Sequence, residues 1–186
     1  MKLIRTTIPD VIIIEPTVFD DARGWFMESF NEKRFHDALE ALGLPVPRVF
    51  VQDNHSFSRK GVLRGLHYQL SPHAQGKLVR VVRGMALDVA VDMRKESPTF
   101  GKWVMVELTE NNRKMLWIPE GFAHGFVAME DNTEFLYKTT DYYAKDCERC
   151  VKWNDTTLAI KWPDNVEMVI SEKDEQGLAF AEADYF

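Results

Sequence analysis

Short segments of alternating apolar and polar residues, separated by turn signals, most limit the folds open to this chain. The clearest segment is Met85–Arg94, where apolar side chains take every second position and Asp88 and Asp92 lie between them. A period of two is that of a β-strand. The other candidate strands are 11–19, 24–30, 49–58, 62–69, 77–82, 102–109, 114–118, 123–129 and 134–140. Many short strands at close spacing predict an all-β protein, an antiparallel sandwich or barrel.

Two short helices are expected beside the strands. Asn31 is a suitable N-cap, apolar residues follow it at helical spacing, and Gly43 fits the C-terminal stop. A second helix is expected to open at Ser171, with Asp174 three residues later. The chain has 186 residues and no internal repeat or linker, so residues 1–186 are expected to form one domain.

Charge and hydropathy argue against several classes of function. The chain has 23 basic and 29 acidic residues, a net charge of −6, so no nucleic acid partner is expected. No run approaches the roughly 20 apolar residues of a membrane helix, so no membrane partner is expected. The apolar patch at 11–14 is closed by Glu15 and Pro16. We therefore expect no signal peptide and a cytoplasmic protein.

The cysteines and histidines do not follow a standard metal-binding pattern. Cys147 and Cys150 are spaced C-x-x-C, but no second pair of ligands accompanies them, so we expect two reduced thiols. The P-x-G-x-x-H spacing at 119–124 is similar to the second half of a cupin motif. Where a metal-binding cupin has H-x-H and a glutamate, this chain has His-Tyr-Gln at 67–69, and Lys77. We expect no metal and no cofactor; the open alternative is an improvised site of His67, His73 and His124.

Arg64 and His67 raise a question of geometry. They are three residues apart, so in a regular strand they would face opposite sides. A bulge at Gly65 would bring them together, because glycine inside a strand often marks such a bend. The simpler alternative is a surface arginine and a buried, hydrogen-bonded histidine.

A series of segments matches one known family in the same order along the chain. They are Phe19–Phe26, Phe50–Ser56, Val62–Gln69, Gln75–Arg80, Trp117–Phe126, Phe135–Lys138 and Ser171–Asp174. The chain thereby resembles the dTDP-4-dehydrorhamnose 3,5-epimerases, a metal-independent sugar-nucleotide branch of the cupins. The resemblance implies a cupin-type jelly roll, an antiparallel double-sheet barrel with small flanking helices. It also implies a homodimer that exchanges strands at its N-terminal edge.

The implied reaction inverts C3 and C5 of a 4-keto sugar through enolates, without a cofactor. His67 matches the family's base and Asp174 its dyad partner, although helix capping near Ser171 would equally explain the aspartate. Lys77 matches the residue that stabilises the enolate oxygen. Tyr137 matches the acid, and a phenol with a reference pKa of about 10 is protonated at neutral pH. Considered alone, Lys77 would be a solvated lysine and Tyr137 a core tyrosine.

The resemblance also implies a set of residues that bind the nucleotide and the sugar. These are Arg23, Arg64 and Lys173 for the pyrophosphate, Gln52, Asp53 and Asn54 as polar contacts, Glu28, His124 and Glu148 as further contacts, and Tyr143 for stacking on thymine, with Tyr142 as the alternative. Guanidinium and ammonium groups suit a pyrophosphate. These cations are scattered along the chain, so only the fold could gather them.

The implied function is conversion of dTDP-4-dehydro-6-deoxy-D-glucose to dTDP-4-dehydro-L-rhamnose, for the dTDP-rhamnose of surface polysaccharides such as lipopolysaccharide. Three alternatives stay open. The first is a sibling enzyme that epimerises one carbon or shifts the ketone. The second is a non-catalytic cupin that binds a sugar nucleotide, and the third is a metal-dependent cupin.

Overall fold

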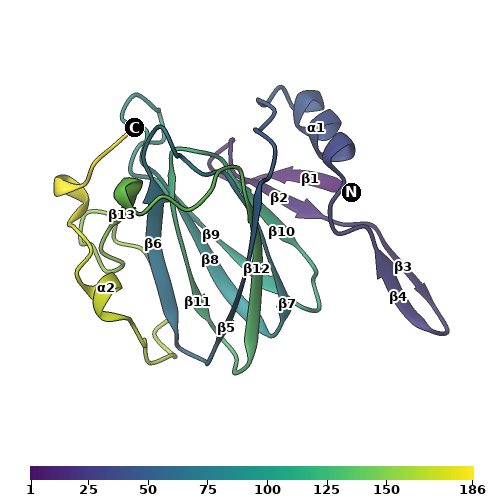
Figure 1. Cartoon of the computed structure of the whole chain (residues 1–186). Coiled ribbons are helices and arrows are strands. Elements are labelled where there is room, and N and C mark those ends of the chain that lie inside the picture. The colour runs from purple at the N-terminus through teal and green to yellow at the C-terminus, as the bar shows by residue number, and fades with distance from the viewer.

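Two antiparallel β-sheets face each other in the computed structural model, which describes residues 1–186 (Figure 1). One sheet has the strand order β1 (Lys2–Arg5), β2 (Ile12–Glu15), β10 (Met115–Ile118), β7 (Lys77–Arg83), β12 (Thr133–Thr139) and β5 (Gln52–Ser58). The other has the order β13 (Glu148–Cys150), β6 (Leu63–Gln69), β11 (Phe122–Ala128), β8 (Met85–Asp92) and β9 (Trp103–Thr109). This arrangement confirms the predicted all-β, double-sheet fold.

The strand positions follow the predicted alternation, with one clear error. The segment 11–19 was expected to be one strand, but β2 ends at Glu15 and a new strand, β3 (Val18–Asp21), follows. Pro16 explains the break, because proline has no N–H to donate to a sheet. Strands β1 and β13 were not predicted from the sequence at all.

Both expected helices are present. In α1 (Glu32–Ala41), the Asn31 side chain accepts the Arg34 N–H at 3.0 Å, and Gly43 follows the end with a φ of +70°. The second helix, α2 (Glu172–Glu175), is a single turn. Short 3-10 helices occur at Lys145–Cys147 and Phe180–Glu182. No helix of the structure has the length and apolar character needed to cross a membrane.

The main hydrophobic core fills the space between the two sheets. The rings of Phe126 on β11 and Phe135 on β12 stack with centroids 4.1 Å apart and join the two sheets near its centre. Val79, Leu116 and Phe135 are fully buried there. Toward β5 and β6 the apolar filling gives way to polar side chains, which leaves a cavity inside the barrel.

The C-terminal segment covers the outer face of the five-stranded sheet. Val89, Val91 and Met93 pack there under residues such as Phe180, which explains why the alternate apolar positions of β8 are buried. The intervening Asp88 and Asp92 are also fully buried, so neither face of this strand is exposed to solvent. The last residues, which carry no sequence signal for function, are part of this cover.

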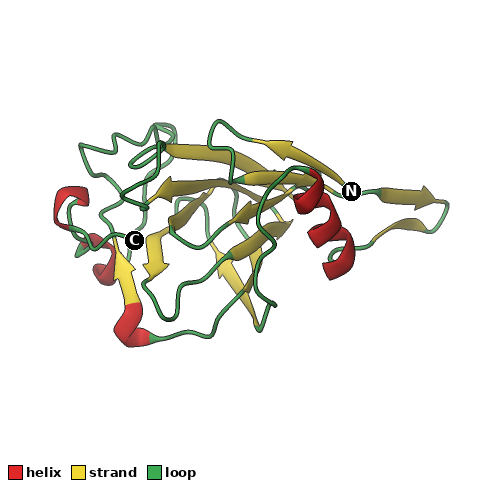
Figure 2. Ribbon diagram, turned by 90° about the horizontal axis from the view of Figure 1, so that it is seen from above, coloured by secondary structure: helices red, strands yellow, loops and turns green.

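A hairpin of β3 and β4 (Gly24–Met27) projects away from the body of the protein, as both Figure 1 and Figure 2 show. Its aromatic side chains are unusually exposed, at 61% for Phe19, 54% for Trp25 and 70% for Phe26. Helix α1 lies beside the base of this hairpin and packs Phe35 and Leu39 against the outer face of the six-stranded sheet. We refer to residues 18–27 as the arm.

Candidate active site

A bulge in β6 determines which side chains enter the cavity. The pairing of β6 with β11 matches His67 to His124 and Arg64 to Phe126, so three steps on one strand face two on the other. The extra residue lies at Gly65–Leu66, which is the bulge that the sequence left open as one of two alternatives, and both Arg64 and His67 line the cavity. Gly65 has a φ of +135°, and a Cβ there would lie 2.5 Å from the Gly125 Cα. Only glycine fits this bend.

His67 and Asp174 form a hydrogen-bonded dyad. The Nε2 of His67 lies 2.6 Å from Oδ1 of Asp174, whose Oδ2 accepts the Gly65 N–H at 3.2 Å. Burial acts to raise the pKa of Asp174, but the bonds from His67 and Gly65 outweigh it and hold that pKa below its ordinary value. The carboxylate is therefore ionised, and the neutral imidazole carries its proton on Nε2. The lone pair is then on Nδ1, which has no hydrogen-bond partner in the protein.

The Asp174 side chain pairs with His67 and does not cap the helix. Ser171 caps α2, because its Oγ accepts the backbone N–H of Asp174 at 3.2 Å, while the Asp174 carboxylate holds His67. The cap fixes the turn that carries the carboxylate. Of the two explanations for the aspartate side chain, the structure therefore supports the pairing with His67.

Lys77 is a buried lysine, not a solvated one. Its side chain is enclosed, and Nζ donates to the backbone oxygen of His67 at 3.2 Å. Burial lowers the pKa of Lys77 to about 8, against the opposing effect of Asp88 and Glu148. The ammonium form still predominates at neutral pH, close to the dyad.

A second histidine–carboxylate pair includes His124, which lines the cavity, and Asp88, which is buried behind it. His124 Nε2 is 2.8 Å from Oδ2 of Asp88, and both residues are buried. Burial lowers the pKa of His124 and raises that of Asp88, despite their attraction. Oδ1 of Asp88 has no hydrogen-bond partner. From the sequence, His124 was expected to contact substrate, whereas Asp88 was expected only on the polar side of a strand and was not identified as a site residue.

Tyr137 lies across the cavity from the dyad. It belongs to β12 of the six-stranded sheet, whereas His67 belongs to β6 of the facing sheet. Burial raises the pKa of Tyr137, so the phenol is protonated at neutral pH. The cavity measures about 340 Å³ and is lined by Ser56, Arg64, His67, Tyr68, Gln69, Gln75, Lys77, His124, Phe126, Tyr137, Glu148, Ser171, Lys173 and Asp174.

The rim of the cavity is held by Glu148. This carboxylate accepts the Lys173 ammonium at 2.7 Å and the Tyr143 hydroxyl at 2.9 Å. Burial acts to raise the pKa of Glu148, but these two bonds lower it overall. The backbone N–H of Tyr143 also donates to Gln52 at 3.1 Å, and Gln52 donates to Asn54 at 3.0 Å. Four of the predicted binding residues are thus connected to Glu148 beside the cavity.

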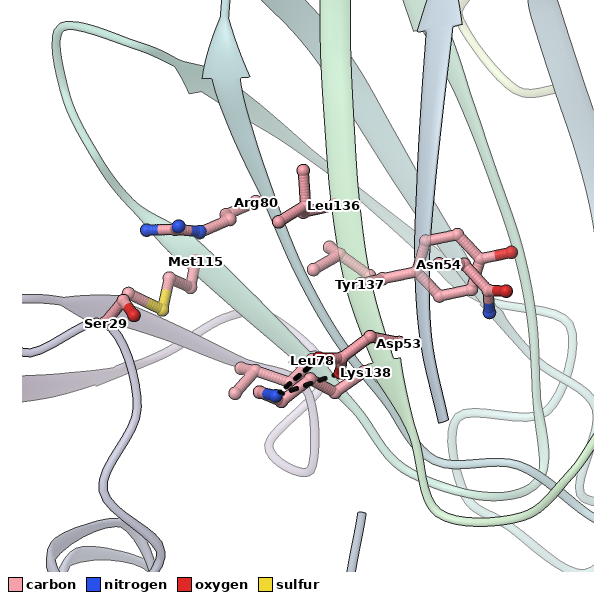
Figure 3. Close-up of a pocket in the computed structure, with 10 residues that line it drawn as sticks. Ser29, Asp53, Asn54, Leu78, Arg80, Met115, Leu136, Tyr137 and Lys138 are labelled. Atoms are coloured by element: carbon pink, nitrogen blue, oxygen red, sulfur yellow. Dashed lines mark hydrogen bonds and ion pairs between the residues drawn. The ribbon is translucent and has the colours of Figure 1, made fainter. Parts of the chain in front are cut away.

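Three predicted binding residues lie elsewhere in this chain. Arg23 is at the tip of the arm, where its side chain is 90% exposed and pairs with Asp21. Glu28 follows the arm and pairs with Arg34. Asp53 faces away from the cavity, and Figure 3 shows it bonded to Lys138 at the edge of a smaller pocket.

The smaller pocket lies on the other side of β12. It measures about 170 Å³ and is formed mainly by side chains of the outer sheet face, including Leu78, Arg80 and Met115. In Figure 3 the Tyr137 ring points away from Arg80 and Met115, on the same side as Asn54. The register of β5 and β12 pairs Asn54 with Tyr137 directly. Asn54 therefore lies on the same side of the sheet as the proposed acid.

Several cavity residues were not identified from the sequence. Ser56 has a buried hydroxyl without a partner, and Gln69 holds the loop above it through the Tyr142 and His73 carbonyls. Cys150 stands beside the dyad, and burial raises the pKa of its thiol to about 12. Both cysteines are free, as predicted. The three histidines of the improvised metal site do not converge: His73 instead faces Asp141 at 3.6 Å.

A jelly roll with an acid–base cavity between its sheets defines a cupin-type enzyme. The model of the family described as dTDP-4-dehydrorhamnose 3,5-epimerase matches residues 5–182, and the chain belongs to this family. It is 59% identical to the dTDP-4-dehydrorhamnose 3,5-epimerase of Shigella flexneri, over 100% of this chain and 99% of the relative. The resemblance seen in the sequence is confirmed.

Solved structures agree with this assignment. The dTDP-6-deoxy-D-glucose-3,5-epimerase of Legionella pneumophila, in complex with dTDP-4-keto-L-rhamnose, superposes with a TM-score of 0.91 at 48% identity, covering 98% of this chain and 94% of that one. A 3'-monoepimerase from Streptomyces bikiniensis in complex with dTDP-quinovose has a TM-score of 0.85 at 33% identity, covering 95% and 87%. The scaffold is therefore shared by enzymes that differ in how many carbons they invert.

Proposed function

We propose that this protein inverts both C3 and C5 of dTDP-4-dehydro-6-deoxy-D-glucose and so forms dTDP-4-dehydro-L-rhamnose. The observation that carries this proposal is the placement of His67 and Tyr137 on facing sheets of one cavity, with Lys77 beside them. A base and an acid on opposite sides of a sugar ring are what inversion of a carbon requires. A relative named dTDP-4-dehydrorhamnose 3,5-epimerase is 59% identical to this chain, which supports the proposal.

The reaction begins with removal of a proton next to the ketone. Nδ1 of His67 takes the proton, the C–H electrons form a carbon–carbon double bond, and the negative charge moves to the C4 oxygen. Asp174 stabilises the imidazolium that results, as the carboxylate does in other His–Asp pairs. The Lys77 ammonium stabilises the enolate oxygen as its charge develops.

The second half returns a proton on the opposite face. The Tyr137 phenol donates to the same carbon, the double bond closes again to the ketone, and configuration is inverted. A proton exchange with solvent then restores the neutral imidazole and the phenol. The same groups serve the second carbon, because C3 and C5 are both adjacent to C4.

The nucleotide would bind at the rim above this chemistry. Arg64 and Lys173 lie in the cavity wall and can neutralise a pyrophosphate. Tyr143 is 55% exposed and offers a ring for the thymine base, with its hydroxyl anchored to Glu148. Gln52, Asn54 and His124 would serve as polar contacts.

We further propose a homodimer in which the arm of one subunit reaches the cavity of the other. Arg23 and Glu28 are far from the cavity of their own chain, and the arm exposes Phe19, Trp25 and Phe26 to solvent. Exposed apolar patches of this kind mark interaction sites. The partner's arm would add the Arg23 guanidinium to Arg64 and Lys173, which already lie in the cavity wall. A cytoplasmic location and a role in supplying rhamnose for surface polysaccharides complete the proposal.

The experiment that tests the proposal is product analysis by NMR. The 4-keto substrate is incubated with the protein, and the configurations at C3 and C5 are determined from ring coupling constants. Inversion at both carbons supports the proposal. Inversion at one carbon would make the protein a mono-epimerase on the same scaffold, and binding without any turnover would make it a sugar-nucleotide-binding cupin.

A further inference from the structure

Cys150 stands next to the catalytic dyad because of a strand pairing. Strand β13 pairs with β6 in a register that places Cys150 directly opposite His67. Side chains in such positions lie on the same face, with Cβ atoms about 4.5–5.5 Å apart. Asp174 approaches the same point from α2. The nearest ligand atoms of His67, Cys150 and Asp174 all lie within 4.8 Å of one another.

The three side chains make a mixed nitrogen, sulfur and oxygen donor set. Zn²⁺ binds all three donor types, at about 2.0–2.3 Å, and a site with three protein ligands keeps a fourth position open. Bonds of that length place neighbouring ligand atoms of a tetrahedral ion roughly 3.3–3.7 Å apart. In the present arrangement His67 and Asp174 are closer than this, at 2.6 Å, and all three ligand atoms lie within 4.8 Å of one another, so the side chains would turn slightly to bind an ion. His67 and Asp174 also line the cavity, so an ion has an entry path and room for water.

We propose that His67, Cys150 and Asp174 form an inhibitory site for thiophilic divalent cations such as Zn²⁺. This inference rests on the proposed function only for its effect on catalysis, not for the binding itself. On binding, the Cys150 thiol releases one proton and becomes a thiolate, and Asp174 remains a carboxylate. The two negative ligands balance the charge of the ion.

Inhibition follows whichever nitrogen of His67 binds the ion. A neutral imidazole has one lone pair. If Nδ1 coordinates the ion, the lone pair that would accept the sugar proton is used directly. If Nε2 coordinates it, the proton of Nε2 moves to Nδ1 and occupies that lone pair. Either way the base is lost, so metal binding and proton abstraction exclude each other.

Cys150 is the ligand that distinguishes this site from an ordinary His–Asp dyad. It has no part in the proposed reaction, so Cys150→Ser should keep the activity of the metal-free enzyme. Zn²⁺ should inhibit the wild-type protein reversibly, with recovery on adding a chelator. In Cys150→Ser the half-inhibiting concentration should rise at least about tenfold, since the loss of even an outer-shell partner of a metal costs roughly 10–100-fold in affinity. Cys147→Ser, three residues away, is the matched control and should keep the wild-type sensitivity.

A direct measurement of binding separates this inference from the proposed function. Titration of the protein with Cd²⁺ should produce the ultraviolet absorption of a cadmium–thiolate bond. The band should disappear in Cys150→Ser, weaken in His67→Asn and persist in Cys147→Ser. An absent band in the wild type, or equal Zn²⁺ inhibition in Cys150→Ser, would overturn the inference. A wild-type band in a protein without epimerase activity would instead leave the site in place and contradict the function.

Discussion

His67 and Asp174 are 107 residues apart in the sequence and 2.6 Å apart between Nε2 and Oδ1. Three local features bring them together. The bulge at Gly65 turns His67 into the cavity, the Gly65 N–H holds the second carboxylate oxygen, and the Ser171 cap fixes the turn that carries Asp174. The dyad is therefore a product of the whole fold, and each feature can be tested separately.

Asp174→Asn should preserve the fold and reduce turnover by about 10²–10⁴-fold. The capping bond uses the backbone N–H of residue 174 and survives the change. The amide cannot stabilise an imidazolium, and it can hold His67 in the wrong tautomer. Loss of a positioned acid–base group typically reduces the rate by about 10²–10⁴-fold. Steady-state kinetics and circular dichroism provide the measurement. Glu175→Gln, an exposed carboxylate on the same helical turn, is the control and should be silent; a silent Asp174→Asn would contradict the account.

Tyr137→Phe should separate proton exchange from inversion. His67 and Lys77 remain, so the enolate still forms, but no acid stands on the far face to complete the inversion. In heavy water we expect deuterium to enter the ring with retained configuration, while the double epimer falls by roughly 10²–10⁴-fold. Tyr142→Phe, at an exposed position, is the control. Equal losses of exchange and inversion in Tyr137→Phe would remove this residue from the proton-return step.

The dependence of kcat/KM on pH should reflect the protonation state of Lys77. Its pKa is lowered by burial to about 8, and the protonated form is the one that stabilises the enolate. The contribution is therefore complete well below pH 8 and is lost as the pH rises through that value. We expect kcat/KM, which reflects the free enzyme, to fall above pH about 8. Lys77→Gln should be much less active and lack this alkaline limb; a variant that kept the limb would assign it to another group.

Gly65→Ala should destabilise the protein more than another glycine substitution at positive φ. A Cβ at Gly65 meets the Gly125 Cα at 2.5 Å and the His124 oxygen at 2.9 Å, whereas one at Gly43 meets nothing within 4 Å. Both variants incur backbone strain of about 1–3 kcal/mol. Because 1 kcal/mol corresponds to about 2–4 °C in Tm at this size, Gly43→Ala should lose a few degrees. Thermal unfolding should show a clearly larger loss for Gly65→Ala, and similar losses would argue against the close approach.

Arm exchange predicts complementation between two impaired variants. Arg23→Ala should weaken substrate binding, and His67→Asn should abolish proton abstraction. In a mixed dimer, one cavity would contain an intact His67 and receive an intact Arg23 from the other subunit. Mixing and refolding the two variants together should therefore recover up to about a quarter of wild-type activity, because half of the dimers are mixed and each has one working site of two. No recovery, with mixed dimers present by mass spectrometry, would contradict exchange.

Much of the fold was accessible from the sequence because its signals are local. Alternation located most strands, and Asn31 and Ser171 marked both helix starts. Strand β13 was not predicted, because its three residues have no alternating pattern and pair only with a strand that is distant in the sequence. The position of Cys150 beside His67 was not predicted for the same reason.

The site was less accessible, since its residues converge only through long-range pairing. Local patterns could not connect His67 to Asp174, or show that Lys77 is buried. The family resemblance supplied the pairing of His67 with Asp174 and the role of Lys77, but not the burial of Lys77. Asp88 was missed because an acidic residue in an alternating strand is normally on a solvated face, whereas both faces of β8 are covered. The resemblance also named Arg23 and Glu28 without showing that their own cavity lies out of reach.

In the proposed mechanism, one histidine serves as the base for both carbons. The test is NMR of the 4-keto sugar nucleotide in heavy water, with the wild-type protein and with His67→Asn. We expect deuterium at C3 and at C5 with the wild type, and at neither position with a folded His67→Asn variant. Exchange at either carbon at near the wild-type rate in that variant would contradict this mechanism.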